Sequence, residues 1–250
     1  MDKTVLLTGA SGGIGSVTAQ ELLRQGAHVI AHYAGDRDDA IAACDGAPEE
    51  RWTVVQGDLS VRGGARALWR EALQWRGRID TVVVNAATMP ETPLDGTDEQ
   101  WDEGWERTLR VNVLEPASLV REAVNHFTQT GGGTIIGLSS WAAERGSAIP
   151  SLTAYAASKA AVRNLIQTIA RNHARDGVLA YVVAPGIVRT PLSEISATYR
   201  GGIDAVNAAL AMGAMVEPVE VARTIAFLAG GSVPNLTGAT LDLNGASHIR

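Results

Sequence analysis

Short apolar runs rich in β-branched residues alternate along the chain with longer segments that have helical periodicity. Strands covered by helices on both faces form nearly continuous apolar runs, because neither face of the sheet meets water. The alternation therefore predicts an α/β protein with a doubly wound parallel sheet of about seven strands and helices on both faces.

The predicted strands and helices follow one another at regular spacing. We expect strands at residues 4–8, 28–33, 52–56, 81–84, 134–138, 179–183 and 240–243, and helices around 14–24, 62–75, 99–127, 155–173 and 219–228. No linker or internal repeat divides the chain, so we expect a single domain over residues 1–250. Residues 190–215 are the least regular part. Because they follow a strand on the side where such sheets bind ligands, we expect a mobile flap over the substrate.

A glycine-rich run, GASGGIG at residues 9–15, separates the first predicted strand from the first predicted helix. Such a tight turn needs positive φ angles, and it presents free N–H groups at a helix N-terminus to an anion such as pyrophosphate. This context favours a dinucleotide site over a tight turn without a ligand. The residues expected to form the site are Gly9, Ser11, Gly13, Ile14 and Gly15.

Tyr155 and Lys159 lie at positions i and i+4 of a predicted helix, so their side chains project from the same face. A free phenol titrates near pH ~10, and a neighbouring ammonium is a simple device that lowers this pKa. Such a pair is also common on exposed helices, where it carries no chemistry. The spacing alone therefore indicates only a candidate tyrosine acid/base.

Composition and charge narrow the classes of partner. The 250 residues carry a formal net charge of −6 without any basic stripe, which argues against nucleic acid and anionic membranes. No stretch resembles a membrane span or a signal peptide, so we expect a cytoplasmic protein. The single cysteine, Cys44, cannot form an internal disulfide and is assigned no chemistry, and we expect no metal site. An enzyme acting on small molecules fits these properties.

Several independent motifs occur in one order along the chain: Thr8 to Gly15, Asn85-Ala86, Asn112, Ser140, Tyr155-x-x-x-Lys159 and Pro185-Gly186. Together they resemble the short-chain dehydrogenase/reductase family over essentially the whole chain. The resemblance implies a Rossmann-like fold, a nicotinamide cofactor, and hydride transfer between nicotinamide and a carbonyl or secondary alcohol. It also implies a homo-oligomer, either a dimer or a tetramer.

The same resemblance implies a catalytic tetrad of Asn112, Ser140, Tyr155 and Lys159. Tyr155 would donate a proton to the carbonyl oxygen, and Ser140 would hydrogen-bond the same atom. Lys159 would lower the pKa of Tyr155 and hold the nicotinamide ribose, while the backbone of Asn112 would help to hold a water. We prefer Ser140 because it ends a strand-derived run at the carboxyl edge of the sheet. The alternatives are Ser139, Ser147 and Ser151.

The residues after the second predicted strand bear on the choice of cofactor. Tyr33 stands where an acidic residue would chelate the adenosine ribose hydroxyls, and Arg37 is the only nearby cation able to bind a phosphate through two hydrogen bonds. Both residues favour NADP(H) over NAD(H). Asp36, Asp38 and Asp39 argue the other way, as does Gly12, which stands where many NADP-using members of the family carry a basic residue.

Three further segments match the family's cofactor site. Asp58, with Leu59 beside it, matches the residue that contacts adenine, although a helix-capping aspartate is the alternative. Asn85 and Ala86 match the residues that form one wall of the family's cofactor site, although Ala87 replaces the glycine that follows in the family pattern. The segment expected to wrap the nicotinamide carboxamide contains Pro185, Gly186, Val188 and Thr190.

We therefore expect an NAD(P)-dependent oxidoreductase, and most specifically an NADPH-dependent ketone reductase similar to 3-oxoacyl reductases. A non-catalytic dinucleotide-binding sensor or scaffold is the alternative. The intact tetrad favours the enzyme, because a sensor needs no positioned acid beside a cation. Trp141, directly after Ser140, either contacts the substrate or is buried in the core.

Overall fold

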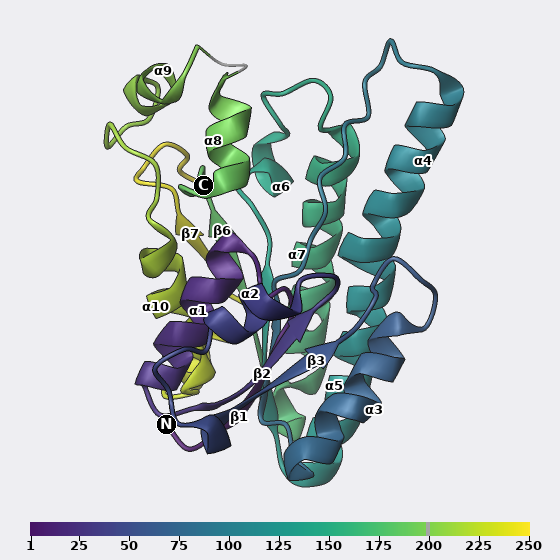
Figure 1. Cartoon of the computed structure of the whole chain (residues 1–250), viewed down its shortest axis with the longest axis vertical. Helices are drawn as coiled ribbons and strands as arrows, with labels where there is room; N and C mark the ends of the chain where they lie inside the picture. The colour runs from purple at the N-terminus through teal and green to yellow at the C-terminus, as the bar shows by residue number, and fades with distance from the viewer. Residues whose placement is uncertain (199–200) are drawn as a thin grey trace.

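The computed structural model describes residues 1–198 and 201–250, which form one seven-stranded parallel sheet with helices on both faces (Figure 1). The strand order is β3-β2-β1-β4-β5-β6-β7, so the chain winds outward from β1 in one direction and then returns to place β4 on the other side of β1. This is the doubly wound, Rossmann-like sheet that the alternating pattern predicted. The strands are β1 (Thr4–Leu7), β2 (His28–Tyr33), β3 (Trp52–Gln56), β4 (Thr81–Val84), β5 (Gly133–Leu138), β6 (Val178–Pro185) and β7 (Thr240–Leu243).

Helices cover both faces, and each face has its own apolar core. Within β1, Leu6 packs into one core while Val5 and Leu7 pack into the other, because successive side chains of a strand point to opposite faces. All three side chains are fully buried, which explains why the strand forms a continuous apolar run. One face carries α1 (Gly13–Arg24), α2 (Arg37–Ala42) and α10 (Pro218–Ala229), and the other carries α3 (Gly64–Arg76), α5 (Glu115–Thr130) and α7 (Thr153–His173).

The helix expected around residues 99–127 contains an irregular turn that the sequence pattern did not predict. It consists of α4 (Asp98–Leu109), a π-helical turn at Arg110–Leu114, and α5. A π turn inserts one extra residue into the helical repeat, and such turns are frequent at functional sites. Asn112 lies inside this turn.

Four short helices were not predicted, because helices of one or two turns carry too little periodicity to detect. They are α2, α6 (Ala142–Arg145), α8 (Pro191–Thr198) and α9 (Ile203–Ala208). The last two lie in residues 190–215, the part expected to be the least regular, and the flap assigned to that part stays a prediction. Tyr199 and Arg200 of the expected flap lie outside the described residues.

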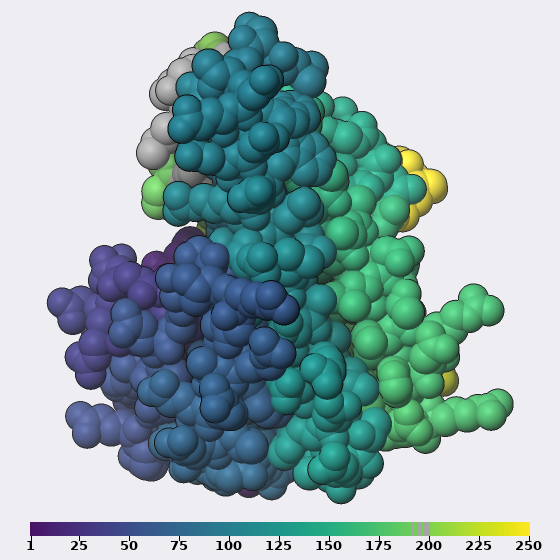
Figure 2. Space-filling view, turned by 90° about the vertical axis from the view of Figure 1, so that its right-hand side faces the viewer, coloured from purple at the N-terminus to yellow at the C-terminus, as the bar shows by residue number. Residues whose placement is uncertain are grey.

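The carboxyl ends of the parallel strands meet at one edge of the sheet, where the molecule is indented. Figure 2 shows this indentation between the N-terminal segments and the segment that contains α4. The position agrees with the general rule that doubly wound sheets bind ligands at the carboxyl ends of their strands. None of the helices formed by residues 1–198 and 201–250 is long and apolar enough to cross a membrane.

Candidate active site

The glycine-rich loop joins β1 to the N-terminus of α1, as predicted. Gly9 has a positive φ of 69°, which favours glycine. A Cβ on Gly15 would lie 1.9 Å from the carbonyl oxygen of Gly9, so only glycine fits at this position. A Cβ on Gly13 would lie 2.8 Å from Cγ2 of Thr190. No described side chain caps α1, so its first N–H groups are available to an anion.

A cavity of about 590 Å³ opens beside this loop. Sequence-predicted residues form much of its wall: Gly9, Ser11, Gly13, Ile14, Gly15, Asp58, Leu59, Asn85, Ala86 and Thr190. An elongated dinucleotide fits such a cleft chemically, because backbone N–H groups lie at one side and a carboxylate at another. Asp58 accepts hydrogen bonds from the backbone N–H and hydroxyl of Ser60, which lower the pKa of its carboxyl group.

Asn85 ties β4 to the glycine loop. Its side-chain amide donates to the carbonyl oxygens of Thr8 (2.8 Å) and Gly9 (3.1 Å). The backbone N–H groups of Asn85 and Ala86 both donate to the Thr8 hydroxyl. The wall expected from the Asn85-Ala86 pair is therefore present, although Ala87 replaces the glycine of the family pattern.

His32 supports the same loop and was not predicted from the sequence. The backbone N–H of Gly9 donates to its Nδ1 (3.0 Å), and its Nε2 lies 2.9 Å from the carbonyl oxygen of Gly57. These partners require a neutral ring with the proton on Nε2, because a carbonyl oxygen can only accept. Burial lowers the pKa of His32, which favours the same neutral form. The available signal was a histidine near the carboxyl end of a largely apolar strand.

Two residues predicted to select the cofactor line neither cavity. Tyr33 is buried, and Arg37 is exposed on the first turn of α2. The cavity near the end of β2 is lined instead by Ala34, Ser60 and Arg107. Arg107 comes from α4, far away in the sequence, so spacing after β2 could not identify it.

A second cavity, of about 270 Å³, adjoins the first and contains Ser140, Tyr155 and Lys159. Ile14, Asn85 and Thr190 line both cavities, so the two form adjoining parts of one site. Ser140 is the second residue after the end of β5, while Tyr155 and Lys159 occupy successive turns of α7. The structure therefore brings three of the four tetrad residues to one wall.

The environments of the four serines favour Ser140. Ser140 lies near enough to Tyr155 to oppose the rise in the pKa of the phenol, and its hydroxyl accepts from the backbone N–H of Ala142 (3.2 Å). The Ser139 hydroxyl instead donates to the carbonyl oxygen of Lys159 (2.8 Å) and stabilises α7. Ser147 lines the cavity, but its hydroxyl accepts from the backbone N–H of Ile149 (3.0 Å), and Ser151 does not line the cavity.

Burial controls the titration of the tyrosine and the lysine. It raises the pKa of Tyr155, although Ser140 acts in the opposite direction. It lowers the pKa of Lys159 to about 8. The Lys159 ammonium donates to the carbonyl oxygen of Leu138 (2.9 Å) and lies 5.6 Å from the centroid of the Tyr155 ring. The net pKa of Tyr155 is thus raised and not lowered in this structure, because desolvation of the phenolate outweighs the effect of Ser140; a lowering by Lys159 stays a prediction.

Asn112 lies behind this wall, and its amide side chain is occupied by structural contacts. Its Oδ1 accepts from the backbone N–H of Thr88 (2.8 Å), and its Nδ2 donates to the carbonyl oxygen of Thr88 (2.9 Å) and to the hydroxyl of Ser158 (3.0 Å). The side chain links the loop after β4, the π turn and α7. It lines neither cavity.

The segment after β6 forms the opposite wall. Residues Pro185, Gly186, Val188 and Thr190 line the smaller cavity, together with Ser193 of α8 and Val206 of α9. Trp141 also lines it and is half-buried, so the indole faces the cavity rather than the core. Residues 1–198 and 201–250 contain no group of three or more His, Cys, Asp or Glu side chains that could hold a metal ion.

Comparison with known proteins gives consistent matches. A family model described as enoyl-(acyl carrier protein) reductase matches residues 9–248. A mouse (Mus musculus) (3R)-3-hydroxyacyl-CoA dehydrogenase is 34% identical over 96% of this chain and 94% of its own length. A cis-4-hydroxycyclohexanecarboxylate dehydrogenase of Sinomonas cyclohexanicum is 31% identical over 98% and 96%. The crystal structure of a 3-oxoacyl (acyl-carrier-protein) reductase from Agrobacterium tumefaciens C58 with NADP bound has a TM-score of 0.85 and 30% identity, and covers 97% of this chain and 93% of its own.

Proposed function

Because the chain belongs to the short-chain dehydrogenase/reductase family, whose enzymes act on CH–OH and C=O groups, we propose that it reduces a ketone to a secondary alcohol with NADPH. The observation that carries the proposal is the convergence of Ser140, Tyr155 and Lys159 on one cavity that adjoins the glycine-rich loop. A bound nicotinamide would supply the hydride.

The side chains of the tetrad then have distinct tasks. Negative charge grows on the carbonyl oxygen as its carbon is reduced, so the oxygen needs donors on the protein side. Tyr155 donates its proton to this oxygen, and Ser140 donates a hydrogen bond to the same atom. The raised pKa of Tyr155 keeps the phenol protonated at neutral pH, as an acid in the reducing direction requires.

Lys159 and Asn112 act from behind the tyrosine. With a pKa of about 8, Lys159 is largely an ammonium at neutral pH and can hold the ribose hydroxyls of the cofactor. The Asn112 side chain links the loop after β4, the π turn and α7, and in this proposal its backbone carbonyl holds a water. In this proposal Asn112 is a positioning residue.

Two features support the finer parts of the proposal. The Agrobacterium relative has NADP bound. Arg37 lines neither cavity, but it is exposed on the first turn of α2, and we assign it to the 2′-phosphate because its guanidinium can bind a phosphate through two hydrogen bonds. The names of the mouse and Agrobacterium relatives support a 3-oxoacyl-type ketone. Apolar side chains suited to the body of such a substrate line the cavity: Met89, Ile149, Leu152, Ile187 and Val206.

We also propose that residues 190–215 act as the substrate flap. Thr190, Ser193 and Val206 come from this segment and line the cavity that holds Tyr155. A small satellite core around Ala197, Val206 and Met215 packs the segment on itself rather than into the main cores. A segment with so few ties to the main cores is suited to moving as a unit.

The test follows oxidation of NADPH and NADH with a panel of ketones that includes a 3-oxoacyl thioester, a cyclic oxo acid and a steroid ketone. We expect turnover with at least one ketone, faster with NADPH. Tyr155→Phe should lose nearly all turnover yet retain cofactor binding. Tyr181→Phe is the matched control, because that buried phenol donates only to the carbonyl oxygen of Val233. Full activity in Tyr155→Phe, or cofactor binding by the wild type without turnover of any ketone, contradicts the proposal.

A further inference from the structure

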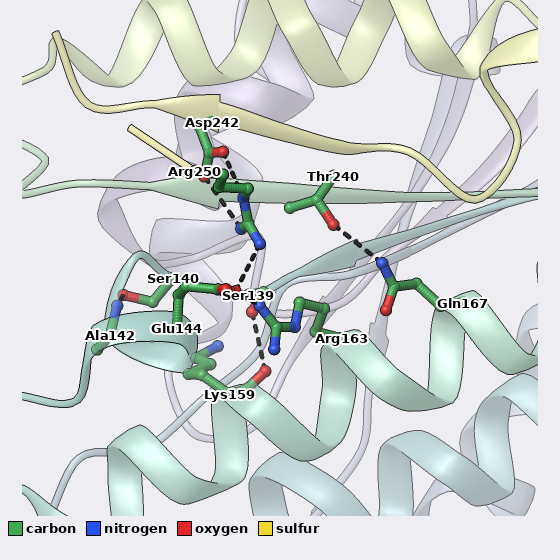
Figure 3. A network of polar contacts seen from close by, with 10 residues as sticks. All are labelled: Ser139, Ser140, Ala142, Glu144, Lys159, Arg163, Gln167, Thr240, Asp242 and Arg250. Carbon is green, nitrogen blue, oxygen red and sulfur yellow. Dashed lines mark hydrogen bonds and ion pairs between the residues drawn. The ribbon is translucent and has the colours of Figure 1, made fainter. Parts of the chain in front are cut away.

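The short helix α6 carries two adjacent charges that have different environments. Glu144 faces α7 and the C-terminus, where it pairs with Arg163 and with Nη1 of Arg250 (2.6 Å). Arg250 also pairs with Asp242 (2.6 Å). Figure 3 shows Glu144, Arg163, Arg250 and Asp242 as one network between α6, α7 and β7. Two guanidinium groups therefore share the Glu144 carboxylate, which fixes α6 on the body of the protein.

Arg145, the next residue, faces the substrate cavity instead. Its guanidinium carbon lies 4.8 Å from the centroid of the Trp141 ring, and both side chains line the cavity with Ser140 and Tyr155. The indole holds the guanidinium from one side by a cation–π contact, which limits the orientations of the Arg145 side chain.

No carboxylate neutralises Arg145. Every Asp and Glu of the chain lies in the part that the structure describes, and none of them forms an ion pair with this residue. Nor does any acidic residue line the cavity within the described residues. The other cation there, Lys159, is buried and already donates to Leu138. The cavity therefore has an excess of positive charge, and Arg145 is its accessible cation.

We infer that Arg145 binds a carboxylate on the substrate, so that the natural substrate is an oxo acid, in place of an uncharged ketone or the 3-oxoacyl thioester that the names of two relatives suggest. The planar guanidinium offers a carboxylate two parallel hydrogen bonds, and the Trp141 contact orients it before binding. From Trp141 to Arg145 the helix rises by about 6 Å. Because Ser140 directly precedes Trp141, the carboxylate would bind at the end of the substrate opposite the carbonyl. The apolar side chains of the cavity wall would then cover the body between the two groups.

This inference rests on the proposed ketone reduction, so the test compares substrates that differ only in charge. The probes are an oxocycloalkane carboxylate, its methyl ester, and a 3-oxoacyl-CoA, whose negative charge lies on carrier phosphates. In the wild type we expect the acid to have the higher kcat/KM. Arg145→Gln should lower the acid-to-ester ratio of kcat/KM about 10-fold, mainly through KM, and Arg145→Lys should restore part of it. Arg121→Gln, an exposed arginine of α5 that lines neither cavity, is the control.

Calorimetric binding of the acid to the protein loaded with NADP⁺ gives a readout that does not need turnover. Arg145→Gln should raise the dissociation constant of the acid about 10-fold and leave that of the ester unchanged. Three results would each overturn the inference. The first is that Arg145→Gln weakens the acid and the ester equally, and the second is that the wild type does not bind the acid. The third is that Arg145→Gln lowers kcat/KM only for the CoA thioester. Wild-type protein that binds the acid through Arg145 but reduces no ketone would overturn the proposed function and leave the carboxylate site intact.

Discussion

Replacing Asn112 by alanine separates the structural role of its side chain from the chemistry beside it. Its amide makes three hydrogen bonds to two segments that are distant in sequence, the loop at Thr88 and the helix residue Ser158. The side chain is only 2% exposed, so water cannot readily replace the lost partners. Asn112→Ala therefore leaves the N–H and carbonyl groups of Thr88 without their partner.

The expected cost follows from these contacts. A net hydrogen bond is worth about 1 kcal/mol, and a buried group left without a partner costs about 1–3 kcal/mol. Ser158 keeps a second partner, because its hydroxyl also donates to the carbonyl oxygen of Tyr155 (2.7 Å). The variant should therefore lose about 3 kcal/mol of unfolding free energy, equivalent to a fall in Tm of roughly 6–12 °C for a chain of this size.

Urea denaturation and thermal unfolding of Asn112→Ala measure this loss of stability. The NADPH-dependent rate, measured well below the new Tm, shows whether the substitution also affects catalysis by Tyr155. The control is Asn172→Ala on α7, an exposed asparagine with a single hydrogen bond to the carbonyl oxygen of Thr168, which should change stability by less than about 0.5 kcal/mol. If Asn112→Ala lost less than about 1 kcal/mol, the hydrogen-bond argument would be refuted.

Three further changes test the cofactor cleft. Gly15→Ala places a methyl group 1.9 Å from a carbonyl oxygen of the loop and should weaken NADPH binding at least about 10-fold in a fluorescence titration, whereas Gly35→Ala, with open space around its Cβ, should not. Burial lowers the pKa of His32 below its ordinary value of 6.5, so below that pH the unfolded chain gains a proton that the folded chain resists. The unfolding free energy should fall with decreasing pH by up to about 1.4 kcal/mol per unit, and less steeply in His32→Gln; equal slopes would contradict this. Arg37→Ala should weaken NADPH binding more than NADH binding. If Arg107→Ala showed this selective loss and Arg37→Ala did not, the contact with the 2′-phosphate would belong to Arg107.

The central strands could be predicted because they are buried on both faces. In β4 and β6 almost every residue is apolar, so the runs stand out without any knowledge of their neighbours. The short helices gave no such signal. α6 has four residues, and its position depends on the Glu144 network with Arg163 and Arg250, contacts that join residues up to 106 positions apart. Periodicity cannot detect an element that only long-range contacts stabilise.

The same distinction between local and long-range requirements applies to the residues of the site. Glycine spacing identified the cofactor loop, because its requirement is local: Gly15 is needed where the backbone returns to Gly9. The side chains that complete the cleft could not be found in this way. His32 and Tyr33 are neighbours on β2, and only the structure shows that His32 supports the loop while Tyr33 is buried. Arg107 reaches the cleft from α4, a helix whose position depends on the whole fold.

Tyr155 and Lys159 illustrate how burial changes the meaning of a spacing. On an exposed helix the pair would form a weak contact, and the nearby ammonium would lower the pKa of the phenol. In this structure both groups are withdrawn from water, so burial raises the pKa of Tyr155 and lowers that of Lys159 to about 8. The two shifts favour the neutral forms and thus a protonated phenol. In the proposed ketone reduction this protonated phenol is the proton donor, and the reverse reaction would require a higher pH to deprotonate Tyr155.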